Sequence, residues 1–189
     1  MKKLAKKIIS MDIGLLYCIT TVLYVCWVMF VVNIYDGSGI SYSTKVYGKL
    51  VADEEVQDRL GFVFIPFIEE ICFRWLPLFS TISLFSILKF ALRKNNVGTQ
   101  VVKTIEKIMI IAVALVSSLI FGFLHGGVYN ILLQGVLGLI LSMFYLRTYY
   151  RRKFAKEWCY LQIYPLLSST LYHILTNGIW YCMDNVSFG

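Results

Sequence analysis

Between Lys107 and Arg147 the chain runs for 39 residues without a formally charged side chain. A membrane-spanning helix needs about 20 apolar residues, so this stretch is too long for one span and suits two. Gly126 and Gly127 mark the natural break, because glycine tolerates the backbone of a turn. A second uncharged run, from Ile13 to Tyr35, exceeds the roughly 7–15 apolar residues of a cleavable signal core and predicts an uncleaved first span.

The composition agrees with a membrane protein. Hydrophobic residues make up 58% of the 189 residues and charged residues only 15%, whereas soluble domains carry about a quarter charged residues. This excludes an ordinary soluble domain and intrinsic disorder. The apolar segments are too long for barrel strands. We therefore expect an all-α, polytopic transmembrane bundle of about five to six membrane helices in one domain, with a first helix and polar loop (residues 1–59) and a membrane core (residues 60–183).

The basic residues predict the orientation and argue against nucleic acid as a partner. With the N-terminus inside and five crossings, 14 basic residues fall on the inner side and three on the outer side, as the positive-inside rule requires. No soluble basic face remains for nucleic acid. The lysine-rich start favours a bacterial cytoplasmic membrane. The five cysteines form no C-x-x-C pair and are interpreted as packing residues, and the oligomeric state is left open.

Three charged residues lie inside the apolar segment that begins near Leu60. A charge near the bilayer centre costs about 2.5–3.5 kcal/mol, so partners are expected. Glu70 and Arg74 stand four residues apart with the acid first, the favourable order for a helical ion pair. Glu69 lies about 100° around the helix, and position i+4 offers it only Phe73. The pattern predicts a structural Glu70–Arg74 pair and a free Glu69; the alternative is one stabilising cluster of all three.

Both histidines of the chain, His125 and His173, also lie in apolar helices. Asn177 follows His173 at i+4 and shares its helix face. Ionisable residues inside a membrane usually face a polar cavity and mark function. Asn130 and Gln134, four residues apart, are interpreted as hydrogen-bonding a neighbouring helix. The serines at 117, 118, 168 and 169 are explained by close helix packing.

Three motifs follow one another in these helices. They are E-E-x-x-x-R (Glu69 to Arg74), F-x-x-x-H (Phe121 to His125) and H-x-x-x-N (His173 to Asn177). Over about residues 60–180 the set resembles the CAAX protease and bacteriocin-processing (CPBP, or Abi) family of intramembrane endopeptidases. Two departures are Trp75 after the motif arginine, where the family often has glycine, and fewer spans than the larger members.

The resemblance implies hydrolysis of a peptide bond in a hydrophobic or membrane-associated substrate. Such hydrolysis needs an activated water and a stabilised oxyanion. Glu69 would be the general base, and His125 would hold and polarise the water. His173 and Asn177 would donate to the oxyanion. Glu70 and Arg74 would orient the helix and tune Glu69, and Phe121 would pack one turn from His125.

A metal mechanism is the alternative. Glu69, His125 and His173 could form a His₂Glu zinc site with one open position. However, the chain contains no H-E-x-x-H motif, and the metal-free mechanism with no cofactor is favoured.

Two other function classes compete with a protease. Relatives include membrane proteins of bacteriocin self-immunity and sensor regulation, so a non-enzymatic binding protein is the second hypothesis. A small transporter would also use intramembrane carboxylates and histidines, but the absence of an internal repeat disfavours it. An isosteric Glu69→Gln change separates the classes, because a binder should tolerate it.

Overall fold

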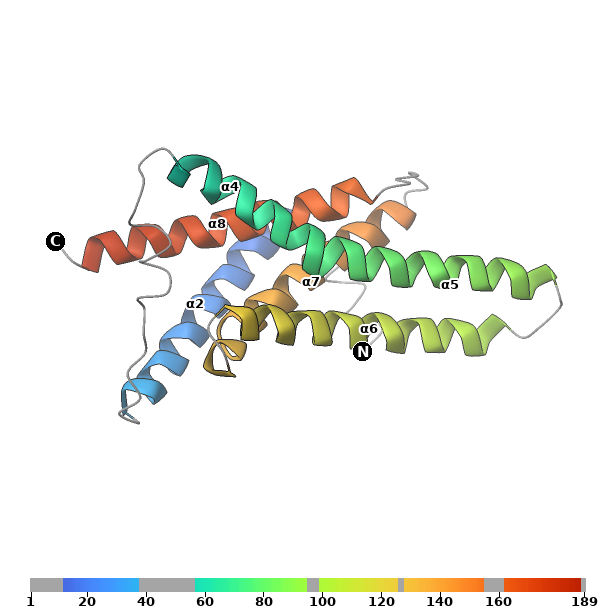
Figure 1. The fold of residues 1–189 in the computed structure, drawn as a ribbon, viewed down its shortest axis with the longest axis horizontal. Helices are drawn as coiled ribbons and strands as arrows, with labels where there is room; N and C mark the ends of the chain where they lie inside the picture. The colour runs from blue at the N-terminus through green and yellow to red at the C-terminus, as the bar shows by residue number, and fades with distance from the viewer. Residues whose placement is uncertain (1–11, 38–56, 95–98, 126–127, 155–161, 188–189) are drawn as a thin grey trace.

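The computed structural model describes residues 12–37, 57–94, 99–125, 128–154 and 162–187, and it contains no strand within these ranges. The described chain forms five long helices, because α4, η1 and α5 follow one another without a gap. This confirms the predicted all-α fold (Figure 1). In chain order the elements are α2 (Ile13–Gly37), α4 (Gln57–Glu70), the π-helical turn η1 (Ile71–Trp75), α5 (Leu76–Lys94), α6 (Thr99–Leu124), the 3₁₀ turn η2 (Val128–Ile131), α7 (Gln134–Phe154) and α8 (Ile163–Ser187).

The helical surface is that of a membrane protein. Among the residues that the structure describes, three helical stretches are long and apolar enough to cross a membrane: Ile13–Ile34, Val63–Leu92 and Gln100–Leu124. Large apolar side chains such as Leu23 and Phe90 are 63% and 76% exposed, which suits a bilayer and would be costly in water. The long uncharged stretch divides as predicted, since α6 ends at Leu124 and α7 begins at Gln134. Residues 126–127, where the break was predicted, lie outside the described residues.

Helix α7 is the centre of the bundle and packs against α6, α8 and α2. One apolar cluster joins α2, α7 and α8, and Leu141 and Phe144 are fully buried in it. A second cluster joins α5, α6, α7 and α8 around Leu78 and Tyr145. Helices α5 and α6 pack side by side along their length (Figure 1).

Small residues let α6 and α7 approach closely. A Cβ on Gly122 would lie 2.6 Å from the backbone nitrogen of Gly135. Ser117 and Ser118 are buried on the same helix and hydrogen-bond the carbonyl of Ala114. This is the close packing that small residues give helices in a membrane, and it brings the C-terminal end of α6 against α7.

Candidate active site

The first part of the site lies on the continuous helix formed by α4, η1 and α5, where the winding changes from α-helical to π-helical. Glu69 and Glu70 end α4, and Arg74 lies in the π turn that follows. The N–H of Leu76 bonds the carbonyl of Ile71, five residues back. Pro77 gives a physical reason, because proline has no N–H and its ring would collide with the carbonyl of Phe73 in a regular α-helix. The helix continues through the proline, and such π turns often mark functional sites.

Glu70 and Arg74 form the predicted pair, fully buried. Arg74 Nη1 lies 3.5 Å from Glu70 Oε1. The guanidinium also stacks on Phe121, with its carbon 4.2 Å from the ring centroid, so the aromatic face shares in compensating the buried charge. Within the described residues, the guanidinium nitrogens of Arg74 and Glu70 Oε2 have no hydrogen-bond partner. The ion pair, the ring face and the contact of His173 with Glu70 therefore compensate these buried charges.

Gly138 of α7 makes the space for this guanidinium. A Cβ on Gly138 would lie 2.8 Å from Arg74 Nη2 and 3.1 Å from the Cα of Ser118. The glycine therefore serves both the crossing of α6 with α7 and the placement of the arginine.

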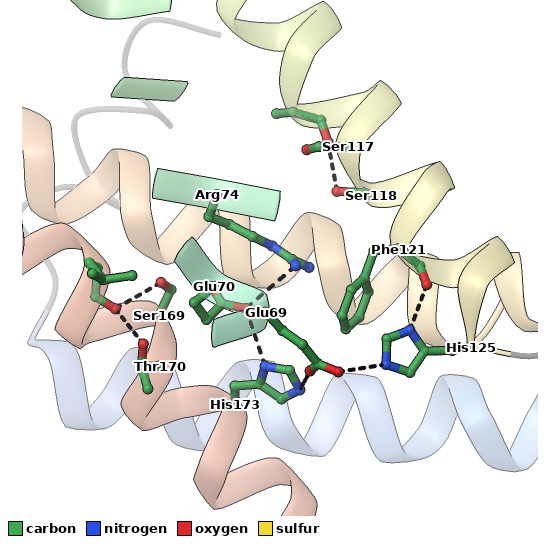
Figure 2. Close-up of polar contacts among 12 residues, drawn as sticks. Glu69, Glu70, Arg74, Ser117, Ser118, Phe121, His125, Ser169, Thr170 and His173 are labelled. Carbon is green, nitrogen blue, oxygen red and sulfur yellow. Dashed lines mark hydrogen bonds and ion pairs between the residues drawn. The ribbon is translucent and has the colours of Figure 1, made fainter. Parts of the chain in front are cut away.

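Glu69 lies between the two histidines (Figure 2). Its Oε1 is 3.2 Å from Nε2 of His125, and its Oε2 is 3.6 Å from Nε2 of His173. The Glu69 side chain keeps 21% of its surface exposed, whereas His173 keeps 1%. The carboxylate that sequence reasoning left unpaired along its own helix is thus held by histidines from α8 and from the end of α6.

The second nitrogen of each ring defines the tautomer. His125 Nδ1 lies 2.7 Å from the carbonyl oxygen of Phe121, which can only accept, so Nδ1 donates. His173 Nδ1 lies 3.2 Å from Glu70 Oε1 and donates to the carboxylate that Arg74 neutralises. Both Nε2 atoms therefore face Glu69. A neutral ring in this tautomer presents the Nε2 lone pair to the carboxylate, so a hydrogen bond at either contact needs a proton on Nε2 or on Glu69.

Phe121 packs against Arg74 and both histidines. Its ring is fully buried, with its centroid 4.1 Å from that of His125 and 5.7 Å from that of His173. The four-residue spacing in F-x-x-x-H also places the Phe121 carbonyl within hydrogen-bond distance of the His125 imidazole. One residue thus supplies both a packing surface and the acceptor that orients the histidine.

The structure brings together six of the seven predicted residues, namely Glu69, Glu70, Arg74, Phe121, His125 and His173. Asn177 lies one turn beyond His173 on α8 and is half-buried. Among the described residues, no hydrogen bond or ion pair joins Asn177 to the other six.

Sequence reasoning missed the role of Asn130. Its amide donates a hydrogen bond to the backbone carbonyl of His125. Asn130 lies in the 3₁₀ turn η2 and α7 begins only at Gln134, so the two residues do not share one regular helix. The one sequence signal was the position of Asn130 shortly after the Gly126–Gly127 break.

An apolar groove lies between α4 and α8, and some of its lining residues are close in sequence to the site residues. Its volume is about 340 Å³. Its lining includes Phe67, two residues before Glu69, and Ile174, next to His173. The other apolar side chains along it are Val63, Phe64, Leu167 and Leu171. The groove between these two helices is therefore lined almost wholly by apolar side chains.

The alternative for these residues is a metal centre. In the part of the chain that the structure describes, no group of three His, Cys, Asp or Glu side chains is arranged to hold a metal ion. Glu69 instead contacts both histidines directly. The zinc alternative stays a prediction, which a direct measurement of bound metal tests.

Fold and site together define an integral membrane protein built around a carboxylate–histidine centre. A family model described as Rce1-like, type II CAAX prenyl endopeptidase Rce1-like, matches residues 59–179, well over half of the chain. The chain therefore belongs to this family of CAAX-type endopeptidases, which confirms the resemblance seen in its motifs. No curated protein and no solved structure matches the chain in the other two comparisons.

Proposed function

We propose that the protein is an intramembrane endopeptidase that hydrolyses a peptide bond of a hydrophobic or lipid-associated substrate. The observation that carries the proposal is Glu69, whose two carboxylate oxygens face Nε2 of His125 and Nε2 of His173. A partly exposed carboxylate between two imidazoles is a suitable base for activating water. The match to a family of CAAX prenyl endopeptidases supports the same reaction class.

In the proposed reaction, Glu69 takes a proton from a water held against His125, and the water oxygen bonds to the scissile carbonyl carbon. The carbonyl oxygen becomes an oxyanion, and His173, with a proton on both ring nitrogens, donates to it through Nε2, with Asn177 as a second donor. The C–N bond then breaks, and the proton on Glu69 passes to the leaving amine. The Nδ1–H bonds to Phe121 and Glu70 keep the two imidazole rings in the same orientation throughout the reaction. No cofactor is required.

The groove between α4 and α8 indicates the substrate class. Its lining is almost wholly apolar and adjoins Glu69 and His173 in the chain. We propose that it takes the apolar part of a peptide or lipid-linked substrate from the bilayer, so that the scissile bond reaches Glu69. The lysine-rich start and the basic inner loops support a bacterial cytoplasmic membrane with the N-terminus inside.

Comparative peptide mass spectrometry tests the proposal. Membranes and medium from cells expressing the wild type are compared with those from cells expressing Glu69→Gln at matched levels. Glu106→Gln is the control, because Glu106 pairs with Lys89 between α5 and α6, away from the cluster. A peptide product that disappears only with Glu69→Gln supports the protease. Identical peptide sets in all three would show that the cluster is a structural feature of a non-enzymatic protein.

A further inference from the structure

The backbone of His125 is held from two sides. On one side, its N–H reaches the carbonyl of Gly122 at 3.3 Å, a long bond in the last turn of α6. On the other, the Asn130 amide donates to its carbonyl from η2. The turn that carries Asn130 is closed by a bond from the N–H of Leu133 to the Asn130 carbonyl, at 3.2 Å. The position of His125 therefore depends on the placement of residues 130–133.

Helix α2 fixes that same turn, although it lies outside the stretch that the family model matches. Trp27 Nε1 donates to the carbonyl of Leu132 at 2.7 Å, and the Tyr24 hydroxyl donates to the carbonyl of Leu133 at 3.3 Å. Leu132 and Leu133 join η2 to α7, and these two bonds connect that junction to α2. Tyr24 is 2% exposed and packs in the same apolar cluster as Leu133, so α2 contacts the start of α7 through buried apolar side chains.

We propose that α2 is a positioning element of the site: Trp27 and Tyr24 hold the 130–133 turn, and Asn130 of that turn holds His125 against Glu69. The inference deepens the proposed function and rests on it. It makes Asn130 a positioning residue that acts through the backbone of His125. A displacement of a catalytic group by about 1 Å can cost about a hundredfold in rate, so a few backbone bonds at this distance from the chemistry matter.

The test uses the full-length chain in lipid nanodiscs, with ¹⁵N in its histidine rings. The chain has two histidines, so His125→Gln and His173→Gln assign the ring signals. In the double variant Trp27→Phe with Tyr24→Phe, which keeps the aromatic packing and removes both donors, we expect the His125 signals to shift or broaden. The His173 signals should stay in place. Asn130→Leu should give the same selective change, and Trp27→Phe alone serves if the double variant does not fold.

Tyr17→Phe is the matched control. It removes another hydroxyl from α2, one that donates to the carbonyl of Ser168 on α8 at 2.8 Å, and it should leave both histidines unchanged. The inference is overturned if the His125 signals match those of the wild type in the double variant and in Asn130→Leu. It is also overturned if Tyr17→Phe shifts them equally, since α2 would then act only through general packing.

A kinetic readout links the signals to the reaction. With the peptide substrate identified by mass spectrometry, the double variant and Asn130→Leu should lower kcat about tenfold or more with KM nearly unchanged, because the apolar groove is untouched. The ring signals are measured without turnover. A wild type that cleaves nothing would therefore refute the proposed function alone, whereas unchanged ring signals would refute the α2 inference alone.

Discussion

Oε1 of Glu69 lies 3.2 Å from Nε2 of His125, while Nδ1 of the same ring is committed to the carbonyl of Phe121. The ring thus connects a fixed backbone acceptor to a partly exposed carboxylate. His173 repeats the arrangement with Glu70 in place of the backbone carbonyl. The Glu69 carboxylate therefore stands between two oriented imidazoles.

Removing the base should abolish hydrolysis while leaving the fold intact. Glu69→Gln keeps the shape of the side chain but cannot accept the proton from water, and we expect kcat to fall by about 10²–10⁴-fold. Glu69→Asp keeps the carboxylate but shortens its reach to both histidines, and it should retain part of the rate. Steady-state cleavage of the identified peptide checks both variants. Equal rates in Glu69→Gln and wild type would contradict the assignment.

The Glu70–Arg74 pair should couple stability to activity. Arg74→Met leaves Glu70 buried without its cation, and losing one partner of a buried pair costs about 3–5 kcal/mol. Adding Glu70→Gln removes the orphaned charge and should recover much of the stability, as read by thermal unfolding in detergent. Activity should stay low in the double variant, because His173 Nδ1 loses its carboxylate partner. Recovery of both properties together would show that the pair does not orient His173.

Gly138→Ala should disturb the site from the α7 side. The added Cβ would lie 2.8 Å from Arg74 Nη2, so the guanidinium or the helix must shift. We expect a loss of about 1–3 kcal/mol in the free energy of unfolding, together with lower activity. Gly14→Ala is the control, because Gly14 is exposed near the start of α2 and only the end of the Asp12 side chain is near. Similar losses in both variants would point to a general effect of alanine in these helices.

Metal removal should leave the enzyme active. Because Glu69 contacts both imidazoles directly, the proposed water activation uses no ion. Purified protein should contain far less than one zinc per chain by elemental analysis, and a strong chelator should not change the cleavage rate. One bound zinc per chain, with activity lost on chelation and restored by zinc, would favour the His₂Glu alternative.

Local patterns in the sequence predict much of this arrangement. The i, i+4 spacing of Glu70 and Arg74 predicts their pair, and the length of the uncharged runs predicts the helices. The clustering of Glu69 with the two histidines follows from the family resemblance together with the cost of isolated polar groups in a membrane. Each of these features can be predicted either from the residue spacing within one helix or from the set of three motifs.

The remaining features depend on tertiary structure. The π turn at Ile71–Trp75 involves a competition between helical bonding and Pro77 that spacing alone does not resolve. The bond from Asn130 to His125 requires the 3₁₀ turn that ends the regular helix face. The space that Gly138 leaves for Arg74 exists only where α7 crosses the second helix. The donors of Trp27 and Tyr24 reach carbonyls more than a hundred residues away in the chain.

Hydrolysis in ¹⁸O-labelled water tests the central claim most directly. The purified wild type in nanodiscs is incubated with the identified peptide, and the products are analysed by mass spectrometry. The account predicts one ¹⁸O atom in the new C-terminal carboxylate of the N-terminal fragment, formed by the wild type and not by Glu69→Gln. Cleavage by Glu69→Gln at the wild-type rate, with the same label, would contradict it, because another group would then be activating the water.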